Sequence, residues 1–251
     1  MYAIGTVMPE NKILIFIPTY NERENVELLC SDILAIDLDF DMLFIDDNSP
    51  DGTGRILDRL SVEQQNIHVI HRESKLGVGS AHLECIRWAY EHQYTTLVTL
   101  DCDFAHTPGY IPDFLSRTHQ YDVVVGSRYL QERSLAGWSL FRKSLTLMGH
   151  VATKTILGMP YDATGAFRAY RLDKIPSKVF DLVHSTSYSF FFESMYALHR
   201  NGFQICDIPI VLPSRTYGHS KMRIVDVFAS IFRLFKMAGA QIARRSQYRI
   251  K

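Results

Sequence analysis

Residues 95–108, TTLVTLDCDFAHTP, are the stretch on which both the fold and the chemistry of this chain depend. The TTLVTL run is β-branched and apolar, which is typical of a short strand buried on both faces of a sheet. Asp101 and Asp103 follow it directly, and Pro108 suits the first turn of a helix. Ligands of open parallel sheets bind at the carboxyl ends of the strands, and paired carboxylates there suit Mg²⁺ or Mn²⁺ shared with substrate phosphates. The alternative is that the two aspartates cap the next helix and bind nothing.

The composition limits the class of protein. The chain has 251 residues and 47% hydrophobic residues, which suits one domain, or one domain with a small addition, and excludes wholesale disorder. Lys plus Arg equals Asp plus Glu at 27 each, so a global attraction to nucleic acid is not indicated. The four cysteines are scattered without a C-x-x-C pair, as expected in a reducing, cytoplasmic compartment. We find no signal peptide and no run of about 20 apolar residues that would span a bilayer.

Four more apolar runs share the character of the opening stretch, and each ends in polar residues: 13–17, 41–45, 67–70 and 122–126. Helical patterns separate them, and we expect Asn21 to cap a helix that continues to about Leu34. This β-α alternation predicts an α/β fold, a mostly parallel twisted sheet with helices on both faces. Because parallel strands point the same way, all five polar strand ends would meet at one edge and form a cleft.

The alternation weakens beyond residue 129. The patterns predict a helix within 136–157, a helix from Phe190 to about Arg200, a strand within 203–212 and a long helix from about 224 to 245. Between them lie a segment rich in aromatic and arginine residues, 161–171, and a polar loop that includes Arg215 and Lys221.

Several common signatures are missing. No G-x-G-x-x-G follows the first strand, no G-x-x-x-x-G-K-[ST] occurs, and no G-x-S-x-G occurs. A dinucleotide-dependent dehydrogenase, a P-loop NTPase and a serine hydrolase of the G-x-S-x-G type are therefore disfavoured.

Seven motifs carry a family resemblance that runs from about residue 12 to 236. The chain resembles the family-2 inverting glycosyltransferases of the GT-A fold in Pro18-Thr-Tyr-Asn-Glu22, Asp46-Asp-Asn-Ser-Pro-Asp-Gly52, Lys75-Leu-Gly-Val-Gly79 and Asp101-Cys-Asp103. It resembles more narrowly the dolichyl- or polyprenyl-phosphate mannosyltransferase branch in Gly126-Ser-Arg128, Thr164-Gly-Ala-Phe-Arg168 and Arg215-Thr-Tyr-Gly-His-Ser-Lys-Met222.

The resemblance implies transfer of mannose from GDP-mannose to a polyprenyl phosphate. It places Asp101 and Asp103 on the metal at the donor diphosphate. The guanine and ribose pocket would be lined by Pro18, Tyr20, Glu22 and Asp47. The cations for the donor diphosphate and the acceptor phosphate would be Arg128, Arg168, Arg215 and Lys221, with Arg142 a further candidate.

Two residues near the D-x-D depart from the family pattern. Cys102 replaces a frequent Ala between the aspartates, which we expect to be tolerated. Ala105 stands where some members have a Gln that also binds the metal, so the ion would keep an extra water molecule here.

The proposed acceptor also fits the residue types of the second half. A phosphate monoester has its second pKa at about 6, so it is largely a dianion at neutral pH and needs cations rather than a general base. For each arginine the alternative is solvation or an ion pair. Asp162 and Glu193 either order the acceptor side or serve the fold, and His106 either touches the diphosphate or caps a turn.

The last helix bears on location. Its apolar side is broad and its end is basic, so it either lies in a membrane interface or packs on the sheet with a solvated tail. We therefore divide the chain into a catalytic domain, residues 1–223, and an amphipathic helix with a basic tail, residues 224–251. The protein would be peripheral to the cytoplasmic face of a membrane, held by this helix or by a membrane-anchored partner subunit.

Two other functions remain open from the sequence. One is a related family-2 enzyme that uses a UDP-sugar such as UDP-glucose, or a sugar hydroxyl acceptor. The other is a nucleotide-binding scaffold subunit without catalysis.

Overall fold

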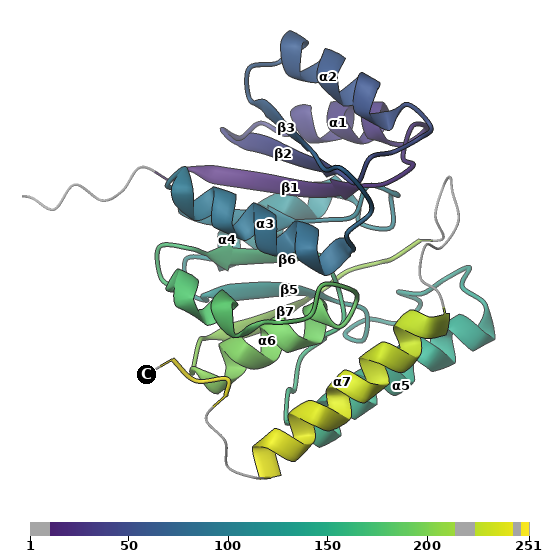
Figure 1. Cartoon of the computed structure of the whole chain (residues 1–251), viewed down its shortest axis with the longest axis vertical. Helices are drawn as coiled ribbons and strands as arrows, with labels where there is room; N and C mark the ends of the chain where they lie inside the picture. Colours follow the sequence, from purple (N-terminus) through teal and green to yellow (C-terminus); the bar gives the residue numbers. More distant parts are fainter. Residues whose placement is uncertain (1–10, 214–223, 243–246, 251) are drawn as a thin grey trace, which may run out of the picture.

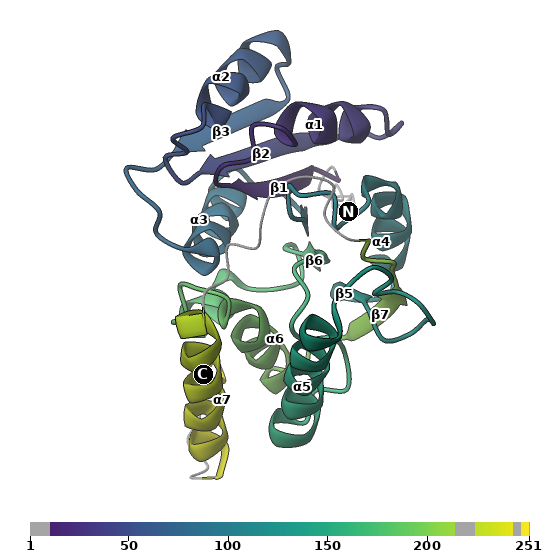
Figure 2. The same cartoon turned by 90° about the vertical axis from the view of Figure 1, so that its right-hand side faces the viewer.

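A computed structural model describes residues 11–213, 224–242 and 247–250 of the chain, and the account below concerns these residues. One twisted sheet runs through the centre of the molecule, with helices in front of it and behind it (Figures 1 and 2). No helix among the described residues is long and apolar enough to cross a membrane.

The sheet has seven strands in the order β3-β2-β1-β4-β6-β5-β7. They are β1 (Ile13–Thr19), β2 (Asp41–Asp46), β3 (Ile67–His71), β4 (Thr96–Thr99), β5 (Val123–Ser127), β6 (Arg168–Arg171) and β7 (Ile205–Pro209). All neighbours pair in parallel except β6, which is antiparallel to both β4 and β5. The prediction of a mostly parallel sheet is therefore confirmed.

Helices cover both faces of the sheet, also as predicted. They are α1 (Val26–Leu34), α2 (Thr53–Glu63), α3 (Val78–Glu91), α4 (Ile111–Arg117), α5 (Leu140–Leu157), α6 (Phe190–Arg200) and α7 (Ile224–Ile242), with short 3-10 turns η1 (Pro108–Tyr110) and η2 (Ser177–Leu182). Figure 1 shows α3 and α6 in front of the sheet and α4 behind it. The period-2 alternation of strand side chains divides the core accordingly: Leu14 and Phe16 pack in one cluster with α3 and α6, whereas Ile15 and Ile17 pack in the other with α1, α2 and α4.

The start of the first helix differs from the prediction. The helix begins at Val26 with Asn25 at the N-cap position. Asn21 instead adopts a left-handed backbone with φ of 54°, and its N–H donates to the Ser49 hydroxyl across the cleft edge. Asparagine tolerates this conformation better than most residues. Asn21 therefore lies in a turn that links the loops after β1 and β2, and it does not cap the helix.

Strand β6 is the element that the sequence analysis did not predict. Its sequence, Arg-Ala-Tyr-Arg, lacks the apolar run of the other central strands. It runs against its neighbours, and its first residue, Arg168, pairs with Thr99 of β4 and Val125 of β5. The start of β6 therefore lies at the edge where β4 and β5 end, and the loop that precedes β6 reaches the same edge.

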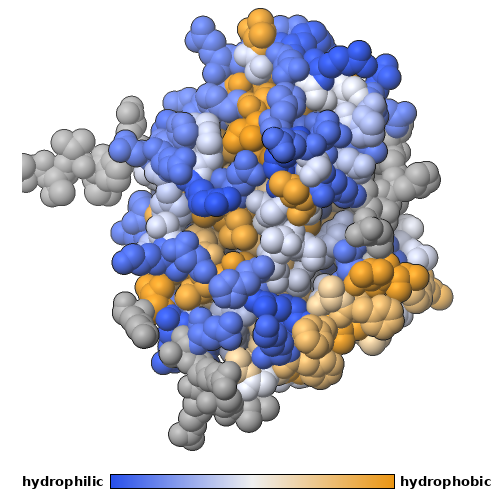
Figure 3. All heavy atoms as spheres, in the orientation of Figure 1, coloured by the Kyte–Doolittle hydropathy of each residue, from blue (hydrophilic) through white to orange (hydrophobic). Residues whose placement is uncertain are grey.

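Helices α5 and α7 contact each other and leave a broad apolar surface exposed (Figure 1). The apolar face, as we call it, consists of Leu140, Phe141, Leu147, Met148 and Val151 of α5 and Ile224, Val225, Phe228, Ile231, Phe232 and Phe235 of α7. Part of it forms the hydrophobic area at the lower right of Figure 3.

Candidate active site

The loops after β1 and β2 are joined at one edge of the sheet. The Glu22 N–H donates to the Thr53 hydroxyl at 2.9 Å, and the Glu22 carboxylate accepts from the Asn25 side chain at 2.7 Å. Pro18 and Tyr20 are half-buried at the end of β1. The Lys75 ammonium lies 4.2 Å above the centre of the Tyr20 ring, a cation–π contact from the loop before α3. The predicted donor-pocket residues Pro18, Tyr20 and Glu22 are thus brought together.

Asp47, the fourth predicted donor-pocket residue, is buried directly after β2. Its carboxylate forms an ion pair with Arg72, which is also buried. Burial raises the pKa of Asp47, and the nearby Arg72 and the Gly77 N–H offset this only in part. Asp47 is therefore held by a cation of its own chain and by the turn at the start of α3.

The D-x-D lies in a tight turn directly after β4. The Ala105 N–H donates to Asp103 Oδ1 at 3.0 Å, and the Asp101 N–H donates to His106 Nδ1 at 2.9 Å. The second bond requires His106 Nδ1 to be unprotonated, and its ring packs against Phe167. His106 thus orders the turn. Asp101 keeps 35% of its side chain exposed, whereas Asp103 is buried.

Three loops at this edge contain a non-glycine residue in the left-handed region. They are Asn21 after β1, Asn48 after β2 and Phe104 after β4, with φ values between 54° and 58°. Such backbone conformations are uncommon for side-chain-bearing residues and concentrate at functional sites. The same edge of the sheet therefore carries both the candidate site residues and the unusual backbone.

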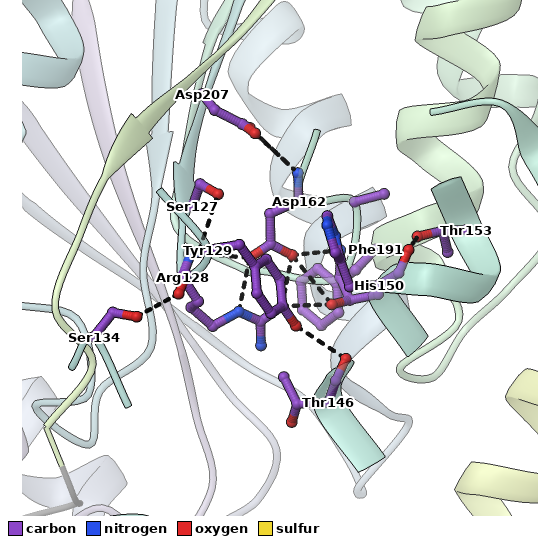
Figure 4. Close-up of polar contacts among 12 residues, drawn as sticks. Ser127, Arg128, Tyr129, Ser134, Thr146, His150, Thr153, Asp162, Phe191 and Asp207 are labelled. Atoms are coloured by element: carbon purple, nitrogen blue, oxygen red, sulfur yellow. Dashed lines mark hydrogen bonds and ion pairs between the residues drawn. The ribbon is translucent and has the colours of Figure 1, made fainter. Parts of the chain in front are cut away.

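Arg128 follows β5 and is fixed by Asp162 from the loop before β6 (Figure 4). Arg128 Nε lies 2.7 Å from Asp162 Oδ2 and Nη2 lies 2.6 Å from Oδ1, while the Arg128 N–H also donates to Oδ2. Burial alone would lower the pKa of Arg128, but Asp162, with smaller effects from Tyr129 and Asp101, raises it. The guanidinium is therefore charged, and it lies at the edge of the sheet at which the D-x-D follows β4.

The same cluster connects to helix α5. The Tyr129 ring stacks on His150 with centroids 3.9 Å apart, and the Tyr129 hydroxyl donates to the Thr146 carbonyl at 2.9 Å (Figure 4). Both partners of Tyr129 belong to α5. The residue next to Arg128 thus attaches the apolar helix to the end of β5.

The prediction that Arg168 binds the donor requires correction. Arg168 has no exposed surface, and its guanidinium donates to the carbonyls of Ala163 and Phe191 and to two hydroxyls, of Tyr170 and Ser194. The prediction came from the place of Arg168 in the motif Thr164-Gly-Ala-Phe-Arg168, which the family resemblance assigns to the site. The structure uses the same side chain to tie β6 to α6 inside the core, because a buried guanidinium needs this many acceptors.

Other predicted residues are placed as follows. Arg215 and Lys221 lie outside the described residues. Arg142 lies with its guanidinium carbon 3.5 Å from the centre of the Trp138 ring, and the Trp138 indole N–H donates to the Pro213 carbonyl at 3.4 Å. Glu193 is fully buried and pairs with Arg233 of α7, so it serves the attachment of that helix.

From the sequence, Asp162 either orders the acceptor side or serves the fold. Its position just before Thr164-Gly-Ala-Phe-Arg168 was the signal, but the sequence did not reveal its partner, Arg128, which lies 34 positions earlier. Arg72 was missed, and Lys75 was named only as part of the motif Lys75-Leu-Gly-Val-Gly79, because the residues next to them in sequence do not show that they contact Asp47 and Tyr20.

The oxygen atoms of the D-x-D suit a metal ion that is also bound by the phosphates of a ligand. Among the described residues no three His, Cys, Asp or Glu side chains gather into a complete metal site. Asp101 and Asp103 offer hard oxygen ligands at the cleft, which fits Mg²⁺ or Mn²⁺ when phosphate oxygens and water molecules complete the shell. A Zn²⁺ site with closed protein coordination does not fit this set.

Comparison with known proteins identifies the family of the chain. Residues 14–176 match the family described as Glycosyl transferase family 2. The chain is 34% identical over 212 residues to undecaprenyl-phosphate mannosyltransferase of Micrococcus luteus, covering 84% of this chain and 87% of that protein. It is 32% identical over 233 residues to polyprenol monophosphomannose synthase of Mycolicibacterium smegmatis, covering 92% and 88%.

Solved structures with a similar fold are more distant in sequence. Glucosyl-3-phosphoglycerate synthase of Mycobacterium tuberculosis, solved with Mn²⁺, UDP and glucosyl-3-phosphoglycerate, gives a TM-score of 0.59 at 17% identity and covers 92% of this chain and 79% of that one. S. aureus TarS with UDP-GlcNAc gives 0.58 at 13% identity, with coverage of 92% and 66%. These likenesses establish the GT-A fold, and the family match covers more than half of the sequence. The chain therefore belongs to glycosyl transferase family 2 and is a glycosyltransferase.

Proposed function

We propose that this enzyme transfers mannose from GDP-mannose to a polyprenyl phosphate, with inversion at the sugar and with Mg²⁺ or Mn²⁺ bound at Asp101 and Asp103. The observation that carries the proposal is that Arg128, held by Asp162, follows β5 at the same edge of the sheet at which Asp101 and Asp103 follow β4. The names of the two relatives with mannose-lipid activities support this choice of donor sugar and acceptor class.

The geometry supports a division of labour across the sheet edge. Pro18, Tyr20, Glu22 and Asp47 lie on one side, where the nucleoside would bind. Arg128 lies on the other side, beyond the D-x-D, where the phosphates would bind. When bound, the metal supplies positive charge to the departing diphosphate. Arg215 and Lys221 are proposed to bind phosphate as well; they lie outside the described residues.

No general base is required for this acceptor. The acceptor phosphate is already largely a dianion at neutral pH. What the chain must supply is a cation that holds the nucleophilic oxygen in place. The side chain of Arg128 suits this task because its salt bridge with Asp162 uses Nε and Nη2 and prevents rotation, so that Nη1 would donate to a phosphate oxygen.

The acceptor lies in a bilayer, and the apolar face supplies a means of reaching it. We propose that residues 1–223 form the catalytic domain and that 224–251, together with α5, hold it on the membrane surface as a peripheral protein. Exposed Phe and Leu side chains on surface helices insert into the headgroup boundary. Tyr129 connects α5 to Arg128, so the membrane contact would lie next to the phosphate-binding side of the cleft.

The test compares donors, acceptors and one pair of variants. Purified enzyme is incubated with GDP-mannose or UDP-glucose, with and without a short polyprenyl phosphate and Mn²⁺, and both nucleotide release and glycolipid are measured. We expect glycolipid only from GDP-mannose with acceptor and metal. Asp101→Asn and Asp103→Asn should lower the rate by at least about 10²-fold, the typical loss on removing one electrostatic stabiliser.

Asp113→Asn is the matched control, because Asp113 is an exposed aspartate in the next helix, α4. It should leave the rate unchanged. Full activity of both D-x-D variants would refute the metal assignment, and glycolipid from UDP-glucose alone would refute the donor.

A further inference from the structure

Glu193 of α6 is the centre of a buried polar clamp that holds the end of the chain. Its carboxylate accepts from Arg233 Nε of α7 at 3.0 Å and from the Tyr248 hydroxyl at 2.9 Å, and Arg233 Nη2 makes a further contact. Glu193 itself has no exposed surface. Burial would raise the pKa of Glu193, but the hydrogen bonds from Arg233, Ser185 and His184 lower it, so the side chain is an anion.

This clamp is the main polar tie between α7 and the body of the protein among the described residues. Apart from Leu234 and Met237, the large apolar side chains described along α7 are half-buried or point outward into the apolar face. A helix that faces solvent with most of its apolar surface gains little from packing. The Arg233–Glu193 pair therefore fixes where α7 lies on the catalytic domain.

The same carboxylate holds a loop on its other side. The N–H groups of His184 and Ser185 donate to the two oxygens of Glu193 at 3.1 and 3.0 Å, and the Ser185 hydroxyl also donates to it. The next residue, Thr186, accepts the Ser80 N–H at 3.0 Å through its carbonyl. The loop thus lies directly against the first turn of α3.

Two glycines confirm how closely the loop and α3 approach. A Cβ at Gly77 would lie 2.5 Å from the Thr186 carbonyl oxygen, and one at Gly79 would lie 2.7 Å from the Ser187 carbonyl oxygen. Real Cβ atoms do not approach this closely, so the loop position and the glycine turn determine each other.

The first turn of α3 in turn holds the donor-pocket aspartate. The Ser80 hydroxyl accepts from Arg72 Nη1 at 2.7 Å, and Arg72 forms the ion pair with Asp47. The Gly77 N–H also bonds to Asp47. A continuous series of hydrogen bonds therefore leads from Arg233 on α7 through Glu193, the 184–187 loop and Ser80 to Asp47.

We propose that Glu193 is a positioning residue that couples the docking of α7 to the donor-nucleotide pocket. With the clamp closed, the 184–187 loop presses on the Gly77–Ser80 turn and holds Arg72 and Asp47 in place for the nucleotide. With Arg233 withdrawn, the turn is free to shift and the donor is bound less well. The identity of the donor and the place of its pocket at Asp47 rest on the proposed function; the series of hydrogen bonds from Arg233 to Asp47 does not.

The experiment uses variants of the full chain without lipid. Arg233→Gln removes the cation, and Glu193→Gln combined with Arg233→Gln also removes the buried anion that would otherwise be left unpaired. Lys236→Gln is the matched control, because Lys236 is exposed on the same helix. Amide hydrogen exchange is followed in peptides that cover 184–187 and 77–80, and GDP with Mn²⁺ is titrated.

We expect both clamp variants to speed exchange in both peptides by about tenfold or more. GDP affinity should fall by about fivefold or more, the lower end of usual coupling between sites. In steady state the donor KM should rise while kcat stays within about twofold, because the clamp touches no reacting atom. Arg233→Lys, which keeps one charge, should restore part of the affinity, and Lys236→Gln should resemble the wild type.

Unchanged exchange in the 77–80 peptide and unchanged GDP affinity in the folded double variant would overturn the proposal. Failure of the proposed function would look different: the exchange differences would remain, but mannose transfer would be absent in the wild type too. A UDP-preferring enzyme would show the same coupling with UDP in the titration.

Discussion

Arg128 and Asp162 meet at two points, Nε to Oδ2 at 2.7 Å and Nη2 to Oδ1 at 2.6 Å, and both side chains are almost or wholly withdrawn from solvent. Arg128 follows the end of β5, and Asp162 lies in the loop before the antiparallel strand β6, which starts at the same edge of the sheet. A reversed strand between β4 and β5 is what allows this pair to form. The cation at the cleft is thus oriented by the sheet topology itself.

This pair predicts a large loss of stability when its anion is neutralised. Asp162→Asn leaves the buried Arg128 charge without its counterion, which usually costs about 3–5 kcal/mol. Glu27→Gln removes one partner of the exposed Arg59–Glu27 pair, whose side chains are 48% and 55% exposed, and should leave the stability close to that of the wild type because water screens such a pair. Urea denaturation of both variants measures the difference.

Two results would contradict this description of the Arg128–Asp162 pair. If Asp162→Asn is as stable as Glu27→Gln, Arg128 finds another acceptor or reaches water, and the description of a fixed cation fails. If it is destabilised but retains full transfer activity, the orientation of Arg128 does not matter to the reaction.

Most of the strands that the sequence predicted share one property: they are local apolar runs, as in β1, β2, β4 and β5, and the sheet buries them. The D-x-D was found for a similar local reason, since two carboxylates directly after such a run have to lie at a sheet edge. Strand β6 and Arg168 could not be found this way. Arg168 can be buried because the carbonyls of Ala163 and Phe191 accept its hydrogen bonds. The tertiary structure brings these acceptors to Arg168, so the residues next to it in the sequence do not reveal them.

Pairings distant in the sequence were missed for the same reason. Glu193 and Arg233 are 40 positions apart, and each alone is consistent with a solvated helix residue. Only the folded chain shows that they meet in a buried site with Tyr248. The family resemblance gave roles to the residues of its motifs. It assigned Arg168 to ligand binding, whereas the structure places this side chain in the core.

Asp207 of β7 predicts a specific pH dependence of stability. Burial and the neighbouring charge of Asp162 raise its pKa from 3.8 to about 7, although the Asp162 N–H and Ser127 donate to it. Folding therefore takes up a proton at Asp207 between these two values. Its contribution to the free energy of unfolding is greatest below about pH 4 and is lost as the pH rises to about 7, with a slope of at most about 1.4 kcal/mol per pH unit.

Asp207→Asn imitates the protonated side chain and should remove this slope. The measurement is urea denaturation of wild type and variant at intervals from pH 4 to 8, taking the difference between the two curves so that other titrating groups cancel. The variant should gain relative to the wild type as the pH rises, then stay level above about pH 7. A difference that is flat over the whole range would show that Asp207 titrates normally.

The apolar face predicts lipid binding that depends on individual aromatic side chains. Phe141 of α5 and Phe232 of α7 are 80% and 72% exposed. Burying one such side chain is worth about 1.5–3 kcal/mol, so Phe141→Ser and Phe232→Ser should each lower vesicle partitioning by about tenfold or more. Flotation with vesicles of mixed neutral and anionic lipids measures it.

Val62→Ser is the control for that experiment. Val62 is 85% exposed but belongs to α2, at the far end of the sheet from α5 and α7 (Figure 1). It should leave partitioning unchanged. Equal losses in all three variants would mean that binding does not use the apolar face, and no loss in either phenylalanine variant would mean that this face does not enter the bilayer.

Two helical glycines give the sharpest test of the contact between α3 and the 184–187 loop. A Cβ at Gly79 would lie 2.6 Å from Phe190 Cβ and 2.7 Å from the Ser187 carbonyl oxygen, whereas one at Gly239 of α7 would meet nothing within 4 Å. Gly79→Ala should therefore destabilise the protein by about 1–3 kcal/mol, because neither neighbour is a flexible chain end. Gly239→Ala should stabilise it by about 0.5–1 kcal/mol through helix propensity alone.

Because the same turn holds Arg72 against Asp47, GDP affinity measured by titration should fall in Gly79→Ala and not in Gly239→Ala. Normal stability and affinity of Gly79→Ala would mean that the loop has room to withdraw and does not define the donor pocket.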